Sequence, residues 1–143
     1  MDIKERVNEI ALKYGTRNPL KIIEAMDIIL IRYPLDGVRG FYHYFQRNHI
    51  IYVDERLSEQ DFLFVIAHEF GHLFLHKDSN AIFMDTRTNF VTNKFEMEAD
   101  RFALNLLIQD SDIEEHLDFT TEQFSRLFGY HKNMIELRLK DFK

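Results

Sequence analysis

The sequence contains no cysteine, and this absence narrows the chemistry open to the chain. Without thiols there can be no disulfide, no cysteine nucleophile and no cysteine-ligated zinc. No stretch approaches the roughly 18 uninterrupted apolar residues of a membrane-spanning helix. The first residues, Met1 to Arg6, are charged where a signal peptide would turn apolar. We therefore expect a cytoplasmic protein with no membrane partner.

Positive charge is also scarce. Lys and Arg number 18 against 24 Asp and Glu, which gives a formal net charge of −6 at pH 7. A general nucleic-acid binder needs a concentration of Lys and Arg to neutralise phosphates. We therefore expect no direct binding to nucleic acid.

Linker signals are missing as well. The chain has only two prolines, Pro19 and Pro34, and shows no internal repeat or low-complexity tract. With 143 residues, 45% of them hydrophobic, it can bury one adequate core. We predict a single domain over residues 1–143, in which 1–110 form a catalytic core and 111–143 a helical C-terminal extension.

Local patterns predict both helices and strands in the first part of the chain. The predicted helices are 3–14, 19–26 and one beginning at Ser58, and the predicted strands are 28–33, 40–46 and 49–54. A tight turn at Arg47-Asn48 would join the last two strands. The expected fold class is α+β, with a small antiparallel sheet beside a helical core.

The strongest functional signal is His68-Glu69-Phe70-Gly71-His72, an HExxH motif inside an apolar run. On a helix, residues four apart project from one face, so both imidazoles can bind one Zn²⁺. Glu69 would lie beside the metal as general base. A chance match is the competing interpretation, but two histidines and a glutamate buried in an apolar helix need a compensating partner, which a metal supplies.

A two-histidine site needs a third protein ligand, and the segment 96–107 offers one. Helical spacing places Glu96 and Asp100 on the face shared by its apolar residues. We predict Glu96 as the third ligand and Asp100 as the group that holds the second ring nitrogen of a ligand histidine. Glu98 falls on the polar face, where pairing with Arg101 at the surface is the simpler interpretation.

Together, the HExxH motif and the Glu96 to Asp100 segment resemble the ImmA/IrrE metallopeptidases, a zincin group with an HExxH plus ExxxD arrangement. The resemblance covers Ile50 to about Ile108 and includes the extra histidine His76. It implies a zincin-like fold with His68, His72 and Glu96 as zinc ligands. It also implies Glu69 as general base, Asp100 as second-layer support, and cleavage of a helix-turn-helix repressor of phage or mobile-element type.

Two nearby alternatives can be weighed by spacing. A metzincin would need a third histidine ten residues after the first, but that position is Asp78. His76 lies one turn beyond His72, and three successive ligands on a straight helix diverge from a single metal. We therefore predict that His76 makes a hydrogen bond near the site or interacts with the helix C-terminus, rather than binding the metal.

In zincins an edge strand beside the HExxH helix commonly receives the substrate backbone, and the predicted hairpin over 40–54 is the candidate here. Several of its side chains could donate a hydrogen bond to an oxyanion, and the sequence does not choose among them. They are Tyr42, His43, Tyr44, His49 and Tyr52.

The residues after Asp110 predict three short helices, 111–117, 121–128 and 132–141, with a spacing loosely similar to a helix-turn-helix. Five basic and seven acidic residues give the segment 111–143 a charge of −2. This favours packing or protein docking over DNA binding.

The combined interpretation is a zinc-dependent endopeptidase that uses metal-activated water on a protein substrate. Two rivals stay open: a metal-containing module that sequesters a repressor without cutting it, and a DNA-binding regulator acting through the C-terminal helices. Glu69 argues against the first, because a site that only holds metal needs no base. The acidic charge argues against the second.

Overall fold

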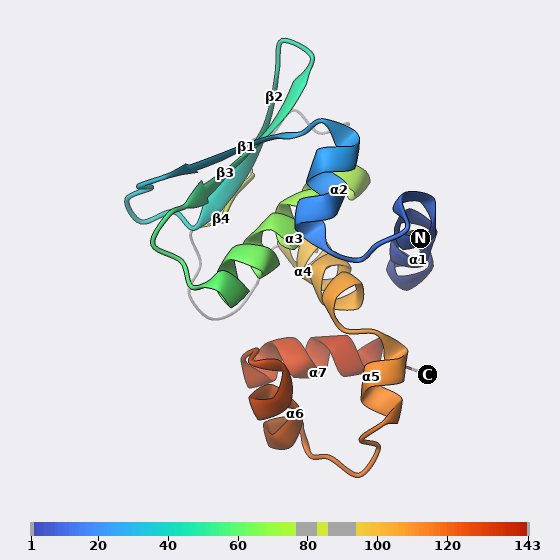
Figure 1. Ribbon diagram of the computed structural model, residues 1–143. Coiled ribbons are helices and arrows are strands. Elements are labelled where there is room, and N and C mark those ends of the chain that lie inside the picture. The colour runs from blue at the N-terminus through green and yellow to red at the C-terminus, as the bar shows by residue number, and fades with distance from the viewer. Residues whose placement is uncertain (1, 77–82, 86–93, 143) are drawn as a thin grey trace.

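The computed structural model describes residues 2–76, 83–85 and 94–142 (Figure 1). The elements in chain order are α1 (Ile3–Tyr14), α2 (Pro19–Met26), β1 (Ile29–Tyr33), β2 (Gly40–Phe45), β3 (Asn48–Asp54), α3 (Glu59–Leu75), β4 (Phe83–Asp85), α4 (Lys94–Leu107), α5 (Asp110–Glu114), α6 (Thr121–Phe128) and α7 (Lys132–Lys140). The α+β class and the helical C-terminal part are confirmed. Among the described helices, none is both long and apolar enough to cross a membrane.

The sheet is mixed, which corrects the expected antiparallel arrangement. Its strand order is β1-β3-β2-β4, with β1 parallel to β3 and the other neighbours antiparallel. Alternation of apolar and polar residues identifies a strand but does not say which neighbour it pairs with. Strand β1 pairs with the side of β3 that does not face β2, and the two strands run in the same direction.

The hairpin turn lies one residue earlier than predicted. β2 ends at Phe45 and pairs there with Asn48, so the turn consists of Gln46 and Arg47, which have φ of 49° and 66°. A two-residue hairpin turn with positive φ at both positions matches the twist of the strands. Asparagine favours such turns, but Asn48 instead donates its side-chain amide to the Gln46 carbonyl at 3.1 Å.

Helix α3 is the central element, between the sheet and α4 (Figure 1). Two glycines permit this packing. A Cβ at Gly40 would lie 2.6 Å from Val65 Cγ1, and a Cβ at Gly71 would lie 2.8 Å from the Ala99 Cα. Both distances are shorter than real contacts allow. Gly71, inside the HExxH motif, therefore lets the backbones of α3 and α4 approach closely.

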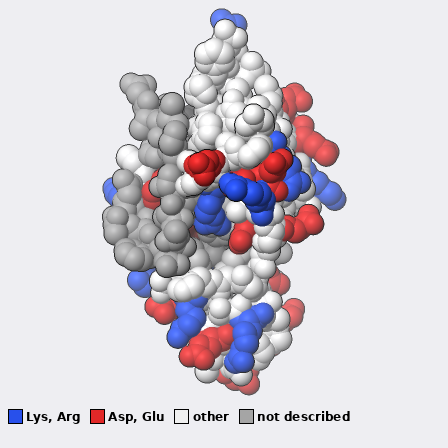
Figure 2. All heavy atoms as spheres, turned by 90° about the vertical axis from the view of Figure 1, so that its left-hand side faces the viewer, with Lys and Arg blue, Asp and Glu red and all other residues white. Residues whose placement is uncertain are grey.

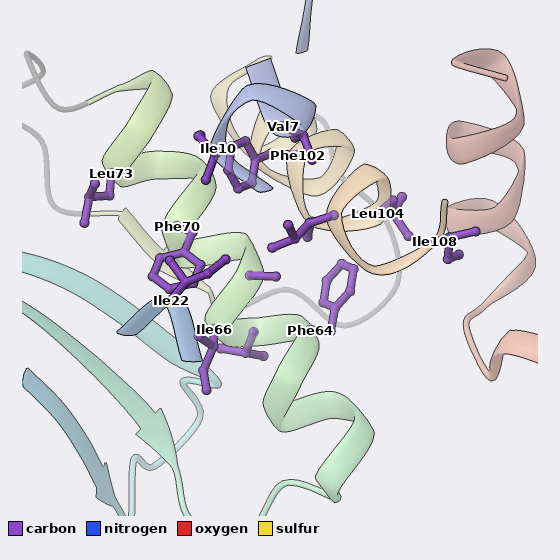
Figure 3. Close-up of a cluster of buried hydrophobic side chains, with 14 of the residues drawn as sticks. Val7, Ile10, Ile22, Phe64, Ile66, Phe70, Leu73, Phe102, Leu104 and Ile108 are labelled. Atoms are coloured by element: carbon purple, nitrogen blue, oxygen red, sulfur yellow. The ribbon is translucent and has the colours of Figure 1, made fainter. Parts of the chain in front are cut away.

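Apolar side chains of α1, α2, α3 and α4 form the core around this contact. In Figure 3, Phe70 and Ile66 of α3 lie beside Ile22 of α2, while Phe102 of α4 lies beside Ile10 of α1. Each of these side chains is almost completely buried. Helices α1, α2 and α4 thus pack against α3 and its neighbours, and the position of the polar residues of α3 is set by apolar packing.

The C-terminal helices pack below α4 in Figure 1. Ile108, Ile113, Phe124 and Ile135 are buried and belong to the same apolar cluster as the core helices. Polar contacts reinforce the junction: the buried Arg138 donates from Nε to the Ile108 carbonyl at 2.9 Å. The boundary at residue 110 and the assignment of one domain stay predictions.

Candidate metal centre

Helix α3 carries His68, Glu69 and His72 into the interior. Ser58 caps its first turn by accepting a hydrogen bond from the Asp61 N–H at 3.2 Å, as the sequence predicted. The apolar side chains on either side of the motif pack in the core, and this packing buries the motif as well. His68 and Glu69 are fully buried and His72 is 1% exposed.

Three side chains converge from two helices. Glu96 Oε1, from the first turn of α4, lies 2.8 Å from His68 Nε2 and 3.2 Å from His72 Nε2. One ligand atom from each residue lies within 4.8 Å of the others. The two imidazole rings stand nearly perpendicular, at 84°, with centroids 4.9 Å apart. Two imidazole nitrogens and one carboxylate oxygen around a common point are a donor set that suits a transition-metal ion, Zn²⁺ included.

Asp100 supports His68 from the other side of the ring. Its Oδ1 lies 2.9 Å from His68 Nδ1, and neither side chain is exposed. When Nδ1 carries the ring proton and donates it to Asp100, Nε2 presents its lone pair to the point shared with Glu96. This is the contact expected from the spacing of Glu96 and Asp100 on α4.

The electrostatics of the cluster favour a positive charge. Burial disfavours the imidazolium of His68, but hydrogen bonds to Asp100 and Glu96 and the nearby charge of Glu69 outweigh it and raise the pKa of His68 to about 10. Burial also disfavours the Glu96 carboxylate, yet hydrogen bonds from His68 and His72 hold its pKa well below the usual range. A site that stabilises positive charge in this way fits a bound metal cation.

His72 is in a different electrostatic environment. Burial is the main cause that lowers its pKa, with the neighbouring rings of His68 and His76 adding to the effect. A neutral histidine can offer the lone pair of one ring nitrogen to a metal, which an imidazolium cannot. His72 is therefore ready to act as a ligand once Nδ1 carries its proton.

The structure corrects the interpretation of Glu98. Glu98 Oε1 lies 2.8 Å from His76 Nε2, and His76 Nδ1 lies 3.0 Å from His72 Nδ1. Arg101, the expected surface partner of Glu98, instead makes a bidentate contact with Asp141, at 3.1 Å and 2.8 Å. The prediction that His76 makes a hydrogen bond near the site is confirmed. Its link to Glu98 was missed, because helical spacing within one element says nothing about a residue at the end of another helix.

Asn105 shares the predicted polar face of α4 with Glu98 by helical spacing, but it is only 2% exposed. Its amide donates to the Arg101 carbonyl and to Asp141 Oδ2. The C-terminal segment covers this side of α4, and a helical-face analysis of α4 alone could not include that cover.

The hairpin side chains form pairs within the sheet. The Tyr42 hydroxyl lies 2.7 Å from His49 Nδ1, and burial, with the charge of Tyr44, raises the pKa of Tyr42 to about 12. The expected role of the hairpin as an edge platform needs correction at residues 40–42, whereas for residues 43–45 the described part of the chain shows pairing with β3 alone. Over residues 40–42, β2 lies between β3 and β4, and the edges of the four-stranded sheet are β1 and β4. An interior strand has no free backbone groups to pair with a substrate.

Comparison with known proteins agrees with this geometry. Residues 23–140 match the model of the family Peptidase_M78, described as IrrE N-terminal-like domain. Metallopeptidase ImmA of Bacillus subtilis (strain 168) is 29% identical, over 96% of this chain and 83% of its own length. An uncharacterized immunity region protein 2 of Bacillus phage phi105 is 33% identical, over 98% of this chain and 93% of its own.

Proposed function

The chain belongs to the ImmA/IrrE metallopeptidase family, and on this premise we propose that it is a zinc-dependent endopeptidase whose substrate is a helix-turn-helix repressor. Family membership makes it a metal-dependent hydrolase of peptide bonds that acts on a protein. The choice of zinc, the roles of individual residues and the repressor are the parts that we propose. The observation that carries the proposal is the convergence of His68, His72 and Glu96 on one point.

In this proposal His68, His72 and Glu96 hold the Zn²⁺. The donor set of two imidazole nitrogens and one carboxylate leaves a position for water or substrate, as catalytic zinc sites require. The bound ion would supply a Lewis acid that polarises the scissile carbonyl and lowers the pKa of a water molecule. Asp100 keeps His68 in the tautomer whose Nε2 presents its lone pair to the ion.

Glu69 would act as general base and then as general acid. It takes a proton from the attacking water while the new C–O bond forms, and it returns that proton to the amide nitrogen as the C–N bond breaks. Its burial keeps the carboxylate away from bulk water. Its position next to His68 in the motif brings it to the same end of α3 as the ligands.

The repressor substrate rests on the family resemblance, and the name of the phage relative, an immunity region protein, agrees with it. The cytoplasmic location expected from the sequence agrees with such a substrate and stays a prediction. So does the absence of direct nucleic-acid binding. On the face shown in Figure 2, basic and acidic residues are interleaved over the C-terminal helices at the bottom of the view.

The test combines metal analysis with a cleavage assay. The protein purified without added metal should contain one zinc per chain. The zinc-loaded protein should cleave a helix-turn-helix repressor, for which one encoded in a neighbouring reading frame is the first candidate. Glu69→Gln, a nearly isosteric change that removes the base, should retain zinc and lose about 10²- to 10⁴-fold in rate. Lack of any bound transition metal in the wild type would contradict the proposal. Binding of the repressor with no cleavage by the wild type would favour the sequestering module instead.

A further inference from the structure

We propose that His76 and Glu98 act as a pair of positioning residues that orient His72 for metal binding. The inference rests on the proposed function, because it assigns a role toward the metal held by His72. It starts from an asymmetry in the site. His68 meets a carboxylate directly, whereas the Nδ1 of His72 faces another imidazole, which in turn meets a carboxylate.

Metal binding through Nε2 of His72 would leave one arrangement of protons along this chain of groups. A neutral imidazole has one N–H, so a metal ligand that binds through Nε2 must carry its proton on Nδ1. The Nδ1 of His72 must then donate to the Nδ1 of His76, 3.0 Å away. His76 can accept only if its own proton is on Nε2, and there Glu98 Oε1 lies 2.8 Å away to receive it. The carboxylate of Glu98 thereby selects the tautomer of His72 through one intervening ring.

The position of His76 explains how it reaches between the two helices. It follows the last residue of α3, and its backbone leaves the helical region with φ of −128° and ψ of 20°. Its N–H still bonds to the His72 carbonyl at 2.8 Å, so the end of the helix stays closed. A residue within the helix would be held over its own face, whereas this ring turns toward α4. Its side chain is 4% exposed, so the contact with His72 is buried, whereas Glu98 is 25% exposed.

Helix α4 provides the carboxylates that contact the histidines of α3 and its C-terminal end. Glu96, Glu98 and Asp100 lie within five residues at the start of this helix, and each contacts a different part of the cluster. Glu96 meets the metal-facing nitrogens, Asp100 the back of His68, and Glu98 the back of His76. The Phe95 ring, 4.5 Å from the His76 ring between centroids, packs against the pair. Both ligand histidines are thus supported by carboxylates of one helix.

A packing role for His76 is the competing explanation, and substitutions can separate the two. His76→Phe keeps an aromatic ring against Phe95 but offers no acceptor to His72. His76→Asn loses the ring, yet its side-chain oxygen is bonded to Cγ, as Nδ1 is in histidine, and can take its place as acceptor. If positioning matters, the asparagine variant should be the better of the two. If packing matters, phenylalanine should be.

The experiment measures zinc affinity by competition with a chelator on the purified full chain. We expect His76→Phe and Glu98→Leu to weaken zinc binding about 10- to 100-fold, the usual effect of removing a group that supports a ligand. His76→Asn should recover most of the loss. Glu136→Leu, the same change at an exposed glutamate of α7, is the matched control and should leave zinc affinity unchanged. Thermal unfolding of each variant without metal verifies that it folds.

A spectroscopic measurement addresses the proton arrangement directly. In the zinc-loaded wild type, nitrogen-15 NMR of the imidazoles should show His72 protonated on Nδ1 and His76 neutral with its proton on Nε2. Protonation of His76 on Nδ1 would overturn the inference, as would equal zinc affinity of His76→Phe and wild type. Wild-type protein that binds no zinc would instead contradict the proposed function, so the two failures are distinguishable.

Discussion

Two regions of this molecule gather buried and partly buried charged side chains, and they use them differently. At the junction of α4 with the C-terminal helices, Arg138 and Asp110 form a pair at 2.8 Å, Lys4 also contacts Asp110, and Arg101 pairs with Asp141. At the metal centre, two histidines and a glutamate point toward a shared position instead. The junction ties helices together, whereas the centre prepares a place for an ion. Burial of charge alone therefore does not identify a functional site, but convergence of donor atoms does.

The largest effect that sharpens this comparison should come from Glu96→Ala. It removes a proposed ligand, so zinc affinity should fall by more than the 10- to 100-fold expected for Asp100→Ala, which removes only the support of His68. Chelator competition on the two variants gives the comparison. If Asp100→Ala weakened zinc binding more than Glu96→Ala, the assignment of ligand and support would have to be exchanged.

At the junction, Arg138→Met should affect stability and leave the metal unaffected. The change removes charged hydrogen bonds to the Ile108 carbonyl and Asp110 and should lower the free energy of unfolding by about 1.5–3 kcal/mol. Urea unfolding of the metal-free protein measures this loss. The zinc affinity of the folded variant should equal that of the wild type. A loss of zinc affinity of about tenfold would show that the two regions are not independent.

Gly71→Ala should affect both properties, because Gly71 lies in the motif and at the contact of α3 with α4. The added methyl would overlap the Ala99 backbone, so the helices must separate by a few tenths of an ångström or more. We expect a loss of about 1–3 kcal/mol in stability together with weaker zinc binding, since Glu96 and Asp100 move with α4. Urea unfolding and chelator competition on the same sample test the coupling, and a variant as stable as wild type would contradict it.

The smallest effect concerns pH. Burial opposes the charge of Asp110, but hydrogen bonds from Lys4 and Arg138 lower its pKa below the usual value near 3.8. Burial likewise opposes the charge of Asp141, and hydrogen bonds from Arg101 and Asn105 lower its pKa below the same value. A lowered pKa in the folded state stabilises the protein above the unfolded-state pKa, and this stabilisation is lost as pH falls through the folded-state value. At pH 6 the wild type should therefore have a higher melting temperature than Asp110→Asn or Asp141→Asn. The difference should shrink below about pH 4, and a difference that grew on acidification would reverse the sign of the argument.

Several elements follow from local sequence signals that the structure confirms. Asn18 caps α2, and Gly15 ends α1 with φ of 70°. The HExxH motif needs only helical geometry to place His68 and His72 on one face. The face shared by Glu96 and Asp100 could likewise be read from the spacing of apolar residues. In each case the residues concerned lie within a few positions of one another along the chain, so the sequence pattern alone predicts their arrangement.

The sequence by itself thus determined most of the helices, the strands β1, β2 and β3, and the residues that can hold a metal, because these depend on periodicity and capping along one segment. The short strand β4 was not predicted. The tertiary structure alone decided the parallel pairing of β1 with β3, the burial of Asn105, and the link of His76 to Glu98 rather than of Arg101 to Glu98. Each of these joins segments between 20 and 40 residues apart or depends on a cover supplied by another element. Such contacts follow from how whole surfaces pack, and no local pattern carries that information.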